Sequence, residues 1–205
     1  PRRARPGGHD PGDDGVRYGH SPDVFDDRID AGRRLAALLR RELPDPPAEV
    51  PTVVVGLPRG GVPVAKEVAT ALGAPLDVIV VRKLGVPFHR ELAMGAIGEH
   101  GVRVLNRDVM DMAGVDEMAL RRVETAESAE LERRVRRYRG DRPGVALGGA
   151  RAVVVDDGVA TGATAAAACR VARAAGAAEV VLAAPVAPPD WVTRLGDAAD
   201  RYIAV

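Results

Sequence analysis

Apolar residues along the chain follow two periodic patterns that predict alternating strands and helices. Short runs of β-branched residues, such as Val153-Val154-Val155, are typical of buried strands. Apolar residues spaced three and four apart, as from Phe25 to Leu39, are typical of one helix face. The patterns predict helices over about 24–43, 62–72, 116–139, 163–175 and 188–196, and strands over about 52–55, 77–81, 94–97, 102–105, 151–155, 179–184 and 201–205. This alternation implies an α/β fold with a central, mostly parallel sheet and helices on both faces.

Segments without this periodicity are expected to be loops or tails. Residues 1–22 are mostly Arg, Gly, Pro, Asp and His, which predicts a disordered tail or a linker remnant before a single domain over 23–205. Residues 82–93 are expected to form a long loop. The polar helix expected over 116–139 carries stabilising acid–base pairs four residues apart, at Glu117/Arg121, Glu130/Arg134 and Glu132/Arg136.

Composition narrows the classes of protein to which the chain can belong. Of 205 residues, 46% are hydrophobic, which is enough for a sizeable core. The 29 basic and 29 acidic residues balance, which argues against nucleic acid as the main partner. No apolar run approaches the ~18 residues of a membrane span, so no membrane partner is expected. Cys169 is the one cysteine, so no disulfide can form within the chain, and a reducing, cytoplasmic location is expected.

Residues 153–164 carry the clearest chemistry. They read Val-Val-Val-Asp-Asp-Gly-Val-Ala-Thr-Gly-Ala-Thr, which is a strand, an acidic pair, a small-residue loop and a helix start. The carboxylates of Asp156 and Asp157 can accept hydrogen bonds from sugar hydroxyls or hold a metal through water. Backbone N–H groups of residues 161–164 can face a phosphate, whose negative charge the helix dipole favours. The alternative is an ordinary strand–helix crossover with a solvated acidic pair.

A second loop, Gly56-Leu-Pro-Arg-Gly-Gly61, follows the first predicted strand of the sheet. It is neither G-x-G-x-x-G nor a Walker A loop, which disfavours a dinucleotide or ATP site. The pair Gly60 and Gly61 would let backbone amides approach an anion closely, and Arg59 adds a planar fork suited to phosphate oxygens. Lys83 follows the second predicted strand and adds another cation.

The stretch 153–164 closely resembles the phosphoribosyl pyrophosphate (PRPP) motif of type I phosphoribosyltransferases. Phe25-Asp-Asp-Arg-Ile-Asp-Ala-Gly-Arg, Gly-Leu-Pro-Arg-Gly-Gly-Val and Val-Arg-Lys-Leu-Gly look more closely like an uncharacterised bacterial subgroup of that family. The resemblance implies that fold, with a small partial hood, helix 116–139 as a decoration, and residues 85–92 as a flexible lid.

The resemblance also implies roles for particular residues. Asp156 and Asp157 would bind the ribose hydroxyls and hold Mg²⁺ through water, and with Lys83 they form the expected catalytic set. The loop expected to cradle the 5′-phosphate consists of Ala160, Thr161, Gly162, Ala163 and Thr164. The residues expected to bind pyrophosphate are Arg59, Gly60, Gly61 and Lys83.

The expected activity is Mg²⁺-dependent transfer of the 5-phosphoribosyl group of PRPP to a nitrogen acceptor, such as a nucleobase or related heterocycle. Ala160 stands where the 6-oxopurine enzymes carry an aspartate, so hypoxanthine and guanine are disfavoured acceptors. Members of the subgroup continue past 201–205 with an aromatic-rich tail, so a C-terminal segment that forms part of the acceptor side is expected to be missing. The resemblance leaves a homodimer open.

Two other functions remain open from the sequence. One is a regulatory module that binds PRPP without turnover. The other is a phosphotransferase or a receiver domain, although a receiver carries its acidic pair after the first strand, whereas only about fifty residues follow Asp157.

Overall fold

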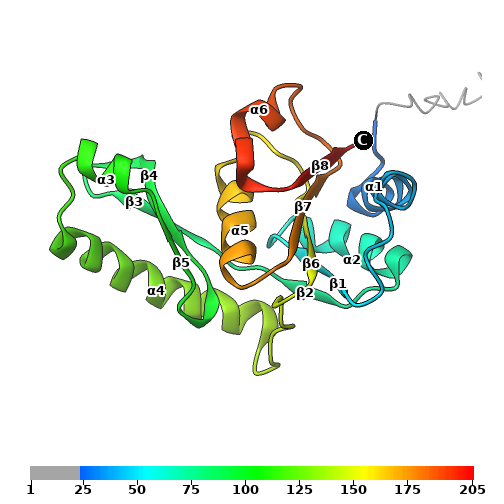
Figure 1. The fold of residues 1–205 in the computed structure, drawn as a ribbon, viewed down its shortest axis with the longest axis horizontal. Coiled ribbons are helices and arrows are strands. Elements are labelled where there is room, and N and C mark those ends of the chain that lie inside the picture. Colours follow the sequence, from blue (N-terminus) through cyan, green and yellow to red (C-terminus); the bar gives the residue numbers. More distant parts are fainter. Residues whose placement is uncertain (1–23) are drawn as a thin grey trace, which may run out of the picture.

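The computed structural model describes residues 24–205, so the tail expected over 1–22 lies outside the described residues. A five-stranded sheet forms the centre (Figure 1). Its strands are β1 (Thr52–Gly56), β2 (Leu76–Val78), β6 (Arg151–Val155), β7 (Glu179–Ala184) and β8 (Arg201–Ala204). They run parallel in the order β2-β1-β6-β7-β8. This confirms the predicted parallel sheet.

Helices cover both faces of this sheet, as Figure 1 shows. Helices α1 (Arg28–Glu42) and α2 (Gly61–Leu72) pack on one face, and α5 (Ala163–Ala174) and α6 (Trp191–Leu195) on the other. All five residues of β6 are buried. Because a strand covered on both faces has no polar side, residues 152–155 form a continuous apolar run and not an alternating pattern, and the one polar residue, Arg151, is the first of the strand.

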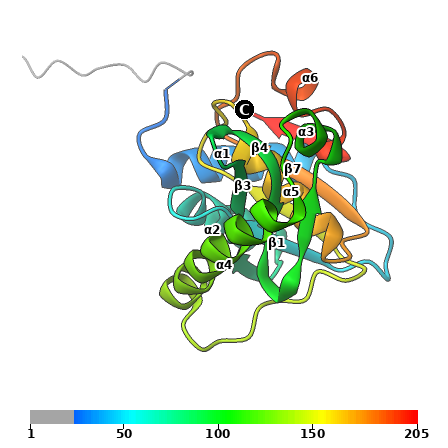
Figure 2. The same ribbon diagram turned by 90° about the vertical axis from the view of Figure 1, so that its left-hand side faces the viewer.

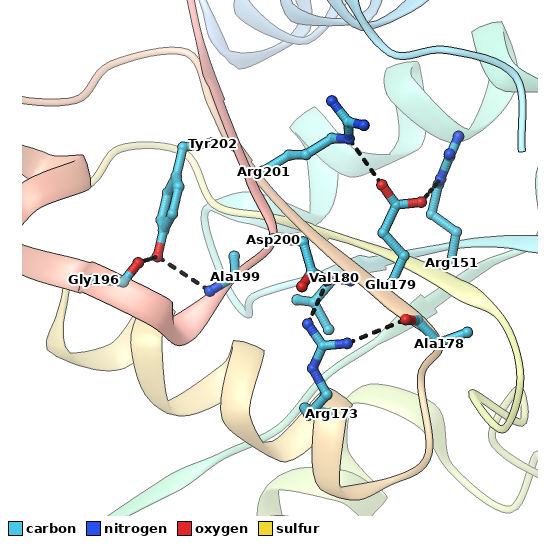
Figure 3. A network of polar contacts seen from close by, with 10 residues as sticks. All are labelled: Arg151, Arg173, Ala178, Glu179, Val180, Gly196, Ala199, Asp200, Arg201 and Tyr202. Atoms are coloured by element: carbon cyan, nitrogen blue, oxygen red, sulfur yellow. Dashed lines mark hydrogen bonds and ion pairs between the residues drawn. The ribbon is translucent and has the colours of Figure 1, made fainter.

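At the edge of the main sheet where the parallel strands begin, charged side chains form hydrogen bonds with one another (Figure 3). Glu179 accepts hydrogen bonds from Arg151 (Nε–Oε2 2.6 Å) and from Arg201 (Nε–Oε1 2.9 Å), and these residues begin three neighbouring strands. Asp200 accepts from the N–H of Val180 (2.7 Å). The charged groups at this edge are thus paired within the protein. In open parallel sheets ligands bind at the opposite edge, where the strands have their carboxyl ends.

Beside the main sheet lies a second unit, residues 82–139, which we call the antiparallel unit (Figure 2). It contains a three-stranded sheet in the order β3-β4-β5 and two helices. The elements are β3 (Arg82–Val86), β4 (His89–Ile97), β5 (Arg103–Leu105), α3 (Arg107–Met112) and α4 (Glu117–Arg139). A separate core, which includes Leu84, Met94, Leu120 and Leu131, holds the unit together.

The long loop predicted over 82–93 is wrong, because β3 and the start of β4 form a hairpin there. The pairing is irregular around Gly85, where a Cβ would lie 2.6 Å from the carbonyl oxygen of Arg90. This irregularity and the charged, exposed start of β4 hide the alternation that marks a half-buried strand.

Other boundaries also differ from the prediction. The strand expected over 77–81 ends at Val78, and Ile79 to Val81 lead into the antiparallel unit. Helix α3 is not anticipated, and α6 covers only part of the helix expected over 188–196.

Helix α4 is confirmed and forms part of the core of the antiparallel unit. Its three predicted charge pairs are present, at 3.7 Å for Glu117–Arg121, 2.7 Å for Glu130–Arg134 and 4.0 Å for Glu132–Arg136. At its end, the buried Arg139 donates to Asp77 of β2 (Nε–Oδ1 2.9 Å) and to both carboxylate oxygens of Glu99. This cluster joins the antiparallel unit to the edge of the main sheet.

Within residues 24–205, no helix combines the length and the apolar character that crossing a bilayer requires.

Candidate functional site

The two loops singled out in the sequence meet at one edge of the main sheet. Strands β1 and β6 are neighbours, and Gly56 is paired with Val155, so both strands end at the same level. The N–H of Leu57 donates to the carbonyl of Val155 (2.8 Å) and extends this pairing into the loop. Residues about one hundred positions apart therefore form one surface.

The pair Gly60 and Gly61 packs directly on the acidic pair. A Cβ on Gly60 would lie 1.9 Å from Oδ2 of Asp157, and a Cβ on Gly61 would lie 2.6 Å from the carbonyl oxygen of Val155. Contacts this short exclude any side chain at either position unless the neighbours move. The preceding Pro58–Arg59 peptide bond is cis.

The two carboxylates of the acidic pair differ in their surroundings. Oδ1 of Asp156 accepts a hydrogen bond from the N–H of Asp157 (2.9 Å). Burial, with a further contribution from the charge of Asp157, raises the pKa of Asp156 to about 6. Oδ2 of Asp157 instead accepts from Arg28 (Nε–Oδ2 2.9 Å, Nη2–Oδ2 2.8 Å). Burial therefore favours the protonated form of Asp156, whereas Asp157 has a cation beside it.

The loop before α5 leaves its backbone donors open. Gly162 has a φ of 77°, and a Cβ there would lie 2.5 Å from Leu195, so this position requires glycine. Within residues 24–205, the N–H groups of residues 161–164 have no hydrogen-bond acceptor. Four free N–H groups at a helix N-terminus are a site for an anion.

Two of the predicted cations also lie at this edge of the molecule. Arg59 is exposed, and Lys83 is half-buried on β3. Neither side chain has a hydrogen bond or an ion pair with any residue that the structure describes. Lys83 lines a hollow of about 490 Å³ between the antiparallel unit and α5, and Ala163, the first residue of α5, lines the same hollow. Lys83 and the start of α5 therefore face a common space.

A comparison with family models identifies the domain. The model of the phosphoribosyl transferase domain matches residues 24–192. The chain belongs to this family.

Relatives support the assignment. The Mycobacterium tuberculosis (strain H37Rv) protein named "Putative phosphoribosyl transferase Rv0571c" is 56% identical over 182 residues, which are 89% of this chain and 40% of that protein. The chain thus spans less than half the length of the curated relative. The crystal structure of TT1426 from Thermus thermophilus is 43% identical, with a TM-score of 0.78, and the match covers 88% of this chain and 84% of that one.

Sequence reasoning missed Arg28 in this phosphoribosyl transferase domain. It lies inside the motif over residues 25–33, yet 129 positions separate it from Asp157. No local pattern in one sequence connects the two, although Asp27 before it has the character of a helix cap.

Proposed function

We propose that this chain transfers the 5-phosphoribosyl group of PRPP to a nitrogen acceptor. The observation that supports this most is the meeting of three anion- or hydroxyl-binding elements at one sheet edge. These are the loop 56–61, the acidic pair, and the free N–H groups before α5. A sugar that carries one phosphate and one diphosphate needs these three elements.

The assignment of ligand parts follows from the chemistry of each element. The 5′-phosphate binds the N–H groups of residues 161–164, and the ribose hydroxyls donate to Asp156 and Asp157. Pyrophosphate binds the amides of Gly60 and Gly61 and the cations Arg59 and Lys83. In the reaction, the acceptor nitrogen bonds to C1 as the C1–O bond to pyrophosphate breaks.

Mg²⁺ is part of this proposal. No cluster of three His, Cys, Asp or Glu side chains suitable for a metal occurs in the described part of the chain. Two carboxylates at a strand end fit an ion that keeps several waters and takes its other ligands from substrate oxygens, as Mg²⁺ does. Bound Mg²⁺ would neutralise charge on the leaving pyrophosphate.

The acceptor is proposed as a heterocycle other than a 6-oxopurine. Ala160 is exposed at the start of the loop expected to cradle the 5′-phosphate, and it offers no carboxylate to an incoming base. A cytoplasmic location fits this substrate class.

The decisive experiment is a thermal-shift titration with PRPP and Mg²⁺, with NAD and ATP as comparison ligands. A ligand at 100 times its dissociation constant stabilises a protein by about 2.7 kcal/mol, which is readily visible as a higher Tm. We expect a shift with PRPP alone among the three. No shift at millimolar PRPP contradicts the proposal. Pyrophosphate release with a panel of heterocycles then separates transfer from binding without turnover.

We also expect Arg59→Ala and Lys83→Ala each to weaken the binding of PRPP and pyrophosphate about tenfold, because each removes a charge-assisted hydrogen bond. Ribose 5-phosphate, which lacks the diphosphate, should lose much less affinity. Calorimetric titration of the three ligands measures the difference. Arg40→Ala on α1 and Lys66→Ala on α2 change exposed cations elsewhere and serve as controls. Equal losses of affinity for all three ligands would show that Arg59 and Lys83 do not bind the diphosphate.

A further inference from the structure

Arg28 contacts the acidic pair through a single oxygen. Both Nε and Nη2 of its guanidinium lie within 2.9 Å of Oδ2 of Asp157, and its side chain is 61% exposed. The pairing therefore leaves the Nη1 donors and much of the guanidinium edge open.

That oxygen is also the one nearest to the loop 56–61. A Cβ on Gly60 would lie 1.9 Å from Oδ2 of Asp157, closer than to any other atom. The head of Arg28 and the backbone of Gly60 thus flank the same carboxylate oxygen. Arg59, the cation of the loop, is the residue next to Gly60.

The backbone of Arg28 is fixed relative to this loop. Asp27 caps α1 by accepting from the N–H groups of Ile29 (2.7 Å) and Asp30 (2.8 Å), so the helix begins at Arg28. Helix α1 then packs on α2, in a core that includes Leu35, Leu39, Val64 and Val68. Helix α2 starts directly after Gly60. The first residue of α1, Arg28, and the loop before α2 therefore both lie beside Asp157.

We propose, on the basis of the proposed function, that Arg28 binds the pyrophosphate end of PRPP and rests on Asp157 when no ligand is present. When ribose hydroxyls approach, Asp157 gains new hydrogen-bond donors while a diphosphate brings several negative charges beside the loop 56–61. A guanidinium forms two parallel hydrogen bonds with phosphate oxygens more favourably than it shares one carboxylate oxygen. Arg28 then moves by side-chain rotation alone, since its helix stays packed.

The proposal predicts that loss of Arg28 weakens the binding of the pyrophosphate group but not the binding of ribose 5-phosphate. In Arg28→Ala, PRPP and pyrophosphate lose a charge-assisted contact, and their dissociation constants should rise about tenfold or more. Ribose 5-phosphate should bind equally well or more tightly, because its hydroxyls no longer compete with Arg28 for Asp157. Arg28→Lys keeps the charge but lacks the planar guanidinium that can donate two parallel hydrogen bonds, so it should lose part of the pyrophosphate affinity.

The experiment is calorimetric titration of PRPP, pyrophosphate and ribose 5-phosphate, each with excess Mg²⁺, into the whole chain. Arg33→Ala is the matched control, because Arg33 lies on the same helix and forms an exposed ion pair with Glu67 (3.2 Å) away from the site. It should leave all three affinities unchanged. Arg28→Gln removes the charge but keeps a polar side chain with part of the aliphatic stem, and it is the second variant, should Arg28→Ala fail to fold.

Each other outcome overturns the inference. Equal weakening of all three ligands means that Arg28 only positions Asp157. Tighter binding of PRPP and pyrophosphate means that Arg28 is purely a competitor, and unchanged affinities mean that the ion pair is a surface contact. If the unchanged chain binds none of the ligands, the proposed function itself fails, which the titration of the unmutated protein shows separately.

Discussion

Gly60→Ala should cost the protein about a hundredfold in PRPP affinity while leaving its stability unchanged or slightly raised. The added methyl group would lie 1.9 Å from Oδ2 and 2.3 Å from Cγ of Asp157, so the carboxylate has to turn away. When the carboxylate of Asp157 turns, it loses its contacts with the ribose hydroxyls and with Arg28. Loss of contacts worth about 3 kcal/mol corresponds to roughly a hundredfold in affinity.

The stability of this variant should be preserved because the backbone tolerates alanine. Gly60 has helical angles, with φ −66° and ψ −36°, and it immediately precedes α2. Alanine fits that conformation and restricts the unfolded chain, which stabilises a protein by about 0.4–1 kcal/mol where no strain results. The clash falls on a side chain that can rotate, so the effect is functional.

Two other glycines give the comparison. Gly61→Ala meets the backbone oxygen of Val155 at 2.6 Å, so the loop must separate from β6, and the free energy of unfolding should fall by about 1–3 kcal/mol. Gly148→Ala has nothing within 4 Å and should change neither property. Chemical denaturation and PRPP titration measure both. Normal PRPP binding by Gly60→Ala would show that the position of Asp157 is unimportant for the ligand.

The parallel sheet and the location of its candidate site could be predicted because each depends on local sequence. A continuous apolar run such as residues 152–155 can only be buried, and parallel strands place their carboxyl ends together. The acidic pair and the loop 56–61 each follow such a strand. The two loops come together because β1 and β6 are neighbours, which the structure shows and the sequence alone does not specify.

The antiparallel unit could not be predicted equally well, because the hydrophobic pattern of its strands is incomplete. Strand β4 begins with four exposed residues and becomes buried only near Met94, so one half of it looks like a loop. The irregular register at Gly85 removes the alternation from β3. Arg28 was missed for a different reason: a contact between residues 129 positions apart leaves no trace in local periodicity.

Asp156→Asn should separate function from stability more sharply than any other change at this site. Burial raises the pKa of this carboxyl from 3.8 to about 6, so ionisation costs free energy in the folded protein. The stabilising contribution of the group is complete below about pH 4 and is lost as the pH rises through 6. Asparagine is neutral, and its carbonyl oxygen can still accept from the N–H of Asp157.

The variant should therefore unfold less readily than the unmutated chain at pH 8, by about 1–2 kcal/mol after allowance for the exposed part of the side chain, and no less readily near pH 4. PRPP affinity should fall about a hundredfold, because a carboxylate that accepts from ribose hydroxyls is replaced by a weaker, neutral acceptor. Denaturation curves at pH 4, 6 and 8 together with PRPP titration at pH 8 measure both effects. Asp141→Asn, at an exposed aspartate outside the site, is the control. A stability gain that does not depend on pH would show that the charge of Asp156 is not its cause, and normal PRPP affinity would remove Asp156 from the ribose site.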